Sequence, residues 1–283
     1  MIGKMSKLYP LYILMLIVGL LASIVNAERS IAEILIKFLV SVPLLQSWFP
    51  NDFHTINTVA WFLSTLMFLQ FCFPVILKFV KRIDWKQAVW ISIAVWIVQI
   101  ASGFFIATHF ERYANWLTYR HPIYRLGDFF VGTMIFSVYS NRRNLDANHS
   151  QIRYTALEVF ALCFSIALCL MFGTIRETMN WFAHTAMLLP ASALLVYVFA
   201  LDRGKLSALL TNAVAVWLSR MSSYIFLIHY LLIIIVLEVI KVVFHFEITN
   251  YSIAAVLTFV LTVFSVYVYL FFESKIQRLR NKR

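Results

Sequence analysis

Three polar side chains within otherwise apolar stretches could take part in chemistry, namely Arg125, Asp128 and His229. Arg125 and Asp128 stand three positions apart in the segment HPIYRLGDFF, so both can lie on one face of a helix. An arginine can hold an anionic or hydroxyl-rich substrate, and a carboxylate can orient it. The alternative interpretation is a self-neutralised ion pair that helps the segment insert into a membrane.

His229 lies in the run SYIFLIHYLLIIIV, about ten residues beyond Arg220 and hence about 15 Å into its helix at about 1.5 Å per residue. A histidine at that depth needs a partner, and its imidazole can relay protons near neutral pH. A hydrogen bond between helices is the alternative. The other six histidines lie near loops or helix ends, and no two show zinc-ligand spacing such as HExxH.

The elements that must position these side chains are long hydrophobic stretches. A bilayer core of about 30 Å needs about 20 apolar residues as a helix, and continuous runs favour helices over a barrel. The sequence therefore predicts an all-α fold, a polytopic membrane helix bundle that forms a single domain over 1–283. Its eight expected transmembrane helices are 8–27, 58–80, 88–109, 123–140, 153–173, 183–201, 222–240 and 252–272.

The composition agrees with a membrane protein. Hydrophobic residues make up 62% of the chain and charged residues only 13%, whereas soluble domains average about 25% charged residues. A net charge of +11 could suggest nucleic-acid binding, but in a membrane protein the location of the charge matters more than its sum. The three cysteines lie in apolar stretches and are odd in number, so we expect neither a disulfide framework nor a metal site.

The basic residues predict the orientation in the membrane. If the first seven residues are cytoplasmic, 17 of the 24 Lys and Arg residues fall on the cytoplasmic side. The positive-inside rule then places both termini in the cytoplasm of a multi-pass protein of the plasma or inner membrane. We expect the first helix to remain uncleaved, the alternative being a secretory signal that ends at Val25-Asn26-Ala27.

The segment 31–50 has the pattern of an amphipathic helix. Apolar residues recur at helical spacing along it, while Glu33, Lys37 and Ser41 share the opposite face. We expect this helix to lie on the outer membrane surface, to end at Pro43 and to be anchored by Trp48.

Four local strings resemble, in order and spacing, the membrane acyltransferase-3 family: KMSKLYPLY, TVAWFLSTLMFLQFCFP, HPIYRLGDFFVGT and LSRMSSYIFLIHY. The resemblance covers essentially the whole chain. Members transfer acetyl or other short acyl groups to sugar hydroxyls of cell-surface polysaccharides, lipopolysaccharide, peptidoglycan or secondary metabolites. The resemblance therefore implies acyl-CoA as co-substrate without a bound cofactor, a carbohydrate acceptor, membrane lipid as the surroundings and no nucleic acid.

The resemblance also assigns residues. Lys4 and Lys7 match the family's basic pair, which lies at the cytoplasmic face and is associated with acyl-CoA. A cationic pair suits the phosphates of coenzyme A, although lysine lacks the bidentate fork of arginine. In the second motif the family's acidic residue is replaced by Met67, and in the third Asp stands for Glu. The matching residues of the other three motifs are Trp61, Ser64, Arg125, Asp128, Tyr224 and His229.

The main departure from the family is at the N-terminus. Members usually open with two further helices, the first of which has the histidine assigned as catalytic base, and this sequence starts where the third helix would begin. We therefore expect little acyl transfer from the chain alone, with His229 as its only deeply placed candidate base. The alternative functions are a catalytically inactive family member and a membrane transporter or flippase.

Overall fold

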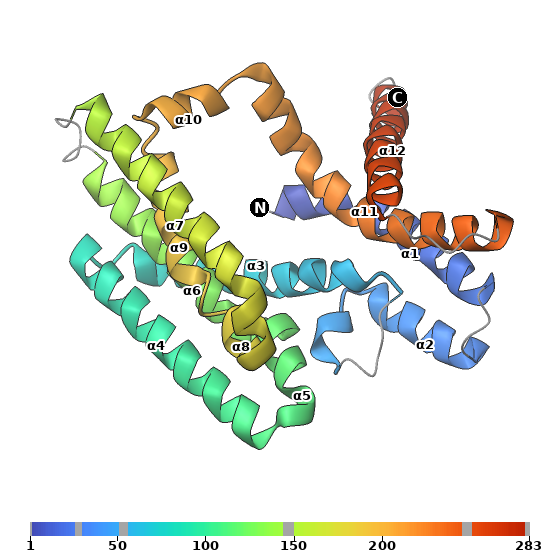
Figure 1. Cartoon of the computed structure of the whole chain (residues 1–283), viewed down its shortest axis with the longest axis horizontal. Coiled ribbons are helices and arrows are strands. Elements are labelled where there is room, and N and C mark those ends of the chain that lie inside the picture. Colours follow the sequence, from blue (N-terminus) through green and yellow to red (C-terminus); the bar gives the residue numbers. More distant parts are fainter. Residues whose placement is uncertain (1, 26–29, 51–55, 144–149, 245–250, 281–283) are drawn as a thin grey trace. The chain divides into compact units, whose positions relative to one another are not determined.

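The computed structural model describes residues 2–25, 30–50, 56–143, 150–244 and 251–280, and every element assigned among them is helical. The helices form two compact units (Figure 1). The first comprises Met1–Gln46, Phe53–Trp61 and Val216–Arg283, and the second comprises Ser47–Asp52 and Phe62–Ala215. The single domain expected over 1–283 stays a prediction.

The first unit is built on α1 (Ile2–Val25), α2 (Ile31–Ser41), the 3₁₀ turn η2 (Thr58–Ala60), most of α11 (Ala213–Phe244) and α12 (Tyr251–Arg280). The Tyr12 hydroxyl donates to the carbonyl of Ser41 at 2.6 Å, which joins α1 to the end of α2. The Asn57 amide donates to the carbonyl of Leu227 in α11 at 3.3 Å. Both bonds are buried, where an unpaired polar group would be costly.

The helix expected in 31–50 is present as α2, which begins after the N-cap Ser30 and ends two residues before Pro43. Two residues of its polar face, Lys37 and Ser41, are turned into the protein and are only 5% and 3% exposed. The third, Glu33, is 48% exposed and pairs with Lys37. The apolar residues Ile31 and Leu39 are 67% and 66% exposed. An outward apolar face suits contact with lipid. The interfacial location of α2 stays a prediction.

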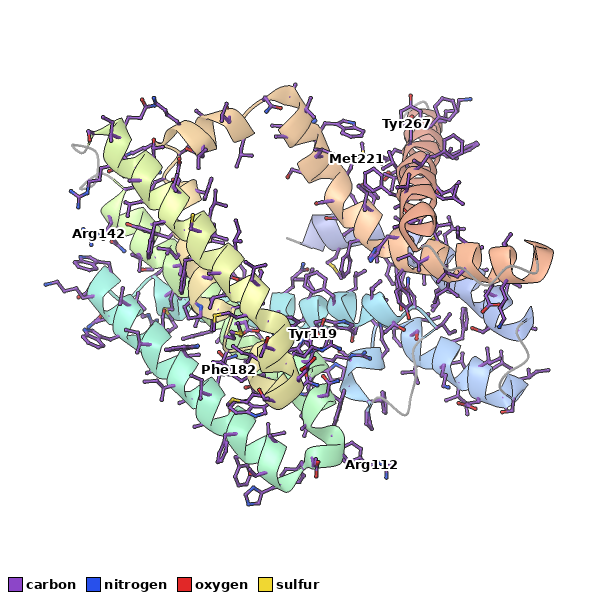
Figure 2. All side chains as sticks on the ribbon, in the orientation of Figure 1. Arg112, Tyr119, Arg142, Phe182, Met221 and Tyr267 are labelled. Carbon is purple, nitrogen blue, oxygen red and sulfur yellow. The ribbon has the colours of Figure 1, made fainter. Side chains whose placement is uncertain are left out.

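The second unit contains the remaining elements. α4 packs on α6, α7 packs on α9, and α6 also packs on α9 (Figure 1). Figure 2 shows Arg112 and Arg142 at opposite ends of this unit. The elements are η1 (Gln46–Trp48), α3 (Trp61–Val80), α4 (Trp85–His109), α5 (Glu111–Asn115), the π-helical turn η3 (Trp116–Arg120), α6 (Pro122–Arg142), α7 (Gln151–Thr178), α8 (Asn180–Ala183), α9 (Leu189–Ala200) and α10 (Lys205–Leu210).

Local sequence determines where α4 and α6 begin. Asp84 and Gln87 form a reciprocal capping box at the start of α4, which satisfies two backbone N–H groups. Pro122 occupies the first turn of α6, where its missing N–H costs nothing. The two helices approach closely at Gly127, where an added Cβ would lie 2.6 Å from Gln99. The glycine therefore allows the Gln99 side chain to lie against α6.

Six helical segments among the described residues are long and apolar enough to cross a membrane: Lys7–Ile24, Thr58–Val80, Trp85–His109, Gln151–Thr178, Ala213–Val239 and Ala255–Lys275. They correspond to six of the eight predicted spans. The other two, 123–140 and 183–201, fall on α6, which contains Arg125 and Asp128, and on α8, a turn and the 12-residue α9. The total of eight stays a prediction.

Candidate functional site

Arg125 and Asp128 form an ion pair, as one of the two interpretations of their spacing predicts, and their role toward a substrate stays a prediction. Nη1 of Arg125 lies 2.6 Å from Oδ2 of Asp128, one helical turn apart on α6. The two side chains are 15% and 24% exposed, so they are mostly removed from solvent. The other carboxylate oxygen, Oδ1, accepts a hydrogen bond from Nε2 of Gln99 on α4 at 2.8 Å. Asp128 is therefore held from two helices.

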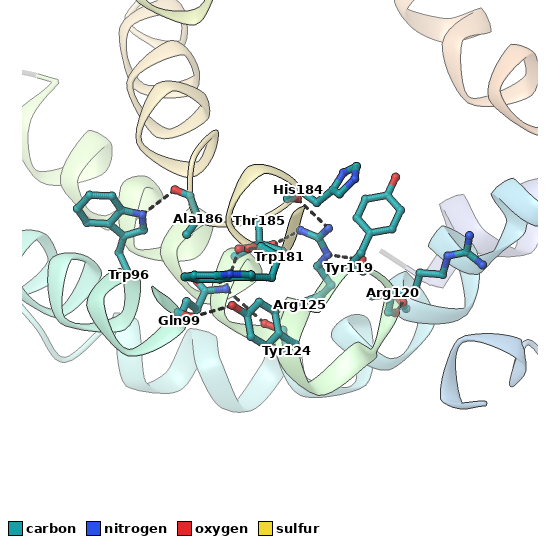
Figure 3. Close-up of polar contacts among 12 residues, drawn as sticks. Trp96, Gln99, Tyr119, Arg120, Tyr124, Arg125, Trp181, His184, Thr185 and Ala186 are labelled. Atoms are coloured by element: carbon teal, nitrogen blue, oxygen red, sulfur yellow. Dashed lines mark hydrogen bonds and ion pairs between the residues drawn. The ribbon is translucent and has the colours of Figure 1, made fainter. Parts of the chain in front are cut away.

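Arg125 also connects α6 to the elements before and after it. Its Nε donates to the carbonyl of Tyr119 at 2.7 Å, and Nη2 donates to the carbonyl of His184 at 3.2 Å (Figure 3). The guanidinium lies 5.2 Å from the centroid of the Tyr119 ring, a cation–π contact. Only the fork of an arginine can make this set of bonds. One consequence is that Arg125 fixes the backbone around the site in addition to the carboxylate.

Three further hydrogen bonds order the elements around the site: one joins α4 to the turn between α8 and α9, one lies within α8 and that turn, and one joins α6 to α4. The Trp96 indole donates to the carbonyl of Ala186 at 2.7 Å, and the Thr185 hydroxyl donates to the carbonyl of Trp181 at the same distance (Figure 3). The Tyr124 hydroxyl donates to the carbonyl of Gln99 at 2.7 Å. The polar groups around Asp128 are therefore in a preorganised arrangement, as binding sites require.

Arg125 and Asp128 line a cavity of about 270 Å³ together with residues of the α8–α9 turn and α9. Because the pair is neutral as a whole, the cavity suits an uncharged ligand rich in hydroxyl groups better than an ion. Its volume lies just below the range of about 300–1,000 Å³ found for pockets of drug-sized ligands. The other polar lining residues are His184, Thr185 and Ser192, and the rest are apolar.

The structure places two other predicted residues at the start of α3. Ser64 is buried, and its hydroxyl lies 2.6 Å from the hydroxyl of Ser47 and also accepts a hydrogen bond from the Ser47 N–H. Trp61, the first residue of α3, is partly buried. Ser64 thus joins α3 to η1, and the role of both residues toward substrate stays a prediction.

The remaining predicted residues belong to the first unit. Nδ1 of His229 lies 3.1 Å from the carbonyl of Ile225, one turn back on α11, so Nδ1 holds the proton and Nε2 is the acceptor in the neutral ring. Tyr224 packs against Tyr269 of α12 with ring centroids 5.9 Å apart. Lys4 and Lys7 lie on the first two turns of α1, where Lys7 is exposed.

Sequence reasoning missed Gln99 and His184. Gln99 was visible as a lone amide within the apolar run of α4, which is a signal for a tertiary hydrogen bond. From the sequence, His184 was one of six histidines expected near loops or helix ends. In the structure its ring packs between those of Tyr119 and Phe172 at centroid distances of 4.6 and 5.2 Å. Within the ranges that the structure describes, no group of three or more His, Cys, Asp or Glu residues could hold a metal ion.

Comparison with known proteins gives one result. A family model described as an acyltransferase domain matches residues 1–270. Neither the curated proteins nor the solved structures gave a match to this chain.

Proposed function

Because the chain belongs to the acyltransferase-3 family, we propose that it is an integral membrane O-acyltransferase. In this proposal it transfers an acyl group, most simply acetyl, from acyl-CoA to a hydroxyl of a cell-surface polysaccharide or glycolipid. The observation that supports it most directly is the neutral Arg125–Asp128 pair at a small cavity with further polar groups. Six membrane-length helical segments agree with chemistry at or within a bilayer.

The reaction sets clear requirements for the protein. The acceptor oxygen forms an ester bond to the thioester carbonyl carbon, the carbon–sulfur bond breaks, and the proton of the hydroxyl ends on the released thiol. A general base must take the hydroxyl proton, and hydrogen-bond donors must stabilise the oxyanion of the tetrahedral intermediate. The acceptor must also be held in a fixed orientation, since well-oriented reactants save about 7–11 kcal/mol of the barrier.

Asp128 is the group proposed to hold the acceptor hydroxyl. Each of its oxygens accepts one hydrogen bond, from Gln99 or from Arg125, and a carboxylate has about four acceptor positions in total. Asp128 can therefore accept a further hydrogen bond from a hydroxyl in the cavity without losing its present partners. Arg125 then acts as a positioning residue, because it holds both the carboxylate and the surrounding backbone.

Two histidines are candidates for the base. His184 lines the same cavity as Asp128. His229 of α11 uses Nδ1 for its bond to the carbonyl of Ile225, so its Nε2 is the nitrogen that would take a proton from the acceptor hydroxyl. On the donor side, exposed Lys7 supports the proposal that the start of α1 meets the phosphates of coenzyme A.

The test is transfer of a labelled acetyl group from acetyl-CoA to a sugar acceptor by the purified chain in lipid nanodiscs. Because little transfer is expected from the chain alone, we expect an acetyl ester to form slowly. Loss of the base, whether by His184→Ala or by His229→Ala, should lower that rate by a further factor of about 10²–10⁴. The matched control is His109→Ala, because His109 is exposed and stacks on Phe105 at the end of α4. Absence of any ester, or turnover that survives both substitutions, would refute the proposal.

A further inference from the structure

A second hollow of the second unit, which we call the α4 groove, is lined in part by Gln99, the residue that donates to Asp128. It has a volume of about 610 Å³, more than twice that of the cavity beside Asp128. Its walls come from α4, η3 and the start of α6, and they are mainly apolar. The lining residues are Ile91, Ala94, Val95, Val98, Gln99, Ser102, Ile106, Leu117, His121, Ile123, Tyr124 and Gly127.

The rim of the α4 groove is exposed at the surface of a helix that could span a membrane. α4 is one of the helices long and apolar enough to cross a membrane. Val98 and Ile123 on the rim are 63% and 59% exposed, which in a bilayer means contact with hydrocarbon chains. At Val98 and Ile123 the groove would therefore open to the hydrocarbon that surrounds a membrane-spanning α4.

The lining from Ile91 to Val98 is wholly apolar, whereas the other end of the α4 groove, which we call its polar end, mixes polar and apolar side chains. Its polar residues are Ser102, His121 and Tyr124, and the His121 ring contacts Trp48 and Trp116 at centroid distances of 5.4 and 5.0 Å. Tryptophans of this kind gather where a membrane meets water. From Ile91 to Ile106 the helix rises about 22 Å at about 1.5 Å per residue. The groove thus has the shape and polarity of a site for an amphiphile with one long apolar chain.

Gln99 connects the α4 groove to the candidate site. The residue is only 5% exposed, and its Nε2 donates to Asp128 at 2.8 Å. Its Oε1 is buried and accepts no hydrogen bond from any residue that the structure describes. An unpaired buried acceptor is unfavourable, so a ligand that supplies a donor here would stabilise the site. Tyr124, at the polar end, is one helical turn from Asp128 on α6.

We infer that the α4 groove binds the hydrocarbon chain of a lipid-linked sugar, so that the acceptor is a glycolipid whose sugar lies beside Gln99 and Asp128. This inference rests on the proposed function and narrows its acceptor. The chain occupies the apolar stretch from Ile91 to Val98, and the first hydroxyl groups meet the polar end of the groove.

The test uses an alkyl glucoside with a photoreactive diazirine in its alkyl chain, added to the full chain in phosphatidylcholine nanodiscs and mapped by mass spectrometry after irradiation. We expect labelling within 91–106 or 121–127, and competition by unlabelled alkyl glucoside but not by a fatty acid of the same chain length. Ala94→Trp, which fills the groove, should weaken the labelling at least about tenfold, equivalent to about 1.4 kcal/mol.

The matched control is Ala101→Trp, an exposed alanine of the same helix that does not line the α4 groove. Val98→Trp at the exposed rim gives a second blocking variant if Ala94→Trp does not fold. Labelling spread evenly over the membrane helices, or equal competition by the fatty acid, would overturn the inference. Labelling requires no turnover, so the two claims can fail separately. Acyl transfer without labelling of the α4 groove would refute the groove as the glycolipid site and leave the proposed function standing. Groove labelling without any transfer refutes the proposed function, and with it the acceptor assignment.

Discussion

Removal of the Arg125 guanidinium tests how the candidate site is held together. Arg125→Met eliminates the bonds to Asp128, to the carbonyl of Tyr119 and to the carbonyl of His184. It also leaves the Asp128 carboxylate mostly buried without its counter-ion. Breaking a buried pair in this way costs about 3–5 kcal/mol, and because the two side chains are 15% and 24% exposed we expect about 3 kcal/mol.

Arg125→Met is one arm of a double-mutant cycle. The other arm is Asp128→Asn, which retains an oxygen that can accept the hydrogen bond from Gln99. We expect it to cost about 1.5 kcal/mol, the loss of one charge-assisted hydrogen bond. If the two side chains interact as the structure shows, Arg125→Met/Asp128→Asn should be less destabilised than the sum of the single variants by at least about 1 kcal/mol.

For the two single variants and the double variant, the quantity to measure is the free energy of unfolding in mixed detergent micelles. Lys81→Met, at an exposed cation of the α3–α4 turn, is the control and should change the free energy by less than about 0.5 kcal/mol. Additivity of the two single effects within about 0.5 kcal/mol would show that the pair is not coupled, and would refute the reasoning.

The other predictions concern packing and pH. Gly127→Ala should destabilise the second unit by about 2 kcal/mol, because the added Cβ would lie 2.6 Å from Gln99, whereas Gly132→Ala, with nothing within 4 Å, should be slightly stabilising when the same unfolding assay is applied. Gly204→Ala should likewise destabilise by about 2 kcal/mol, since its Cβ would collide with the buried Glu158 carboxylate. Its control is Gly173→Ala on α7, which has nothing within 4 Å and should be slightly stabilising like Gly132→Ala. Burial lowers the pKa of His121 from its usual 6.5, so the unfolded chain binds the proton more readily and stability should fall as the pH drops below 6.5. His121→Gln should flatten that pH dependence, and a slope that is unchanged in this variant would contradict the assignment.

The helices that follow from local sequence were predictable. The i, i+3 spacing of Arg125 and Asp128 predicted their pair, and Pro43 marked the end of the helix in 31–50. The order of four short motifs predicted the family, which the match over residues 1–270 confirms. Each of these signals depends on residues close together in the chain.

Tertiary contacts were not predictable in the same way. The bond from Arg125 to His184 joins positions 59 residues apart, and the bond from Gln99 to Asp128 joins positions 29 apart. Glu158 is a further example, since its partners lie almost 50 residues away along the chain. It is 1% exposed and accepts hydrogen bonds from the N–H groups of Leu206 and Ser207 at 3.0 and 3.3 Å, which caps α10. Periodicity gives a residue's face on its helix, but not the element that packs against that face.

The central claim is that the Asp128 cavity holds the acceptor of an acyl transfer. Its most direct test is the effect of Asp128→Asn on the steady-state constants for each substrate, with Asp202→Asn as the control because Asp202 is exposed and asparagine also tolerates its positive φ of 52°. We expect kcat/KM for the sugar acceptor to fall by about 10²-fold, equivalent to about 2.7 kcal/mol, while KM for acetyl-CoA stays within about twofold. An unchanged kcat/KM for the acceptor, or a loss confined to KM for acetyl-CoA, would contradict the claim.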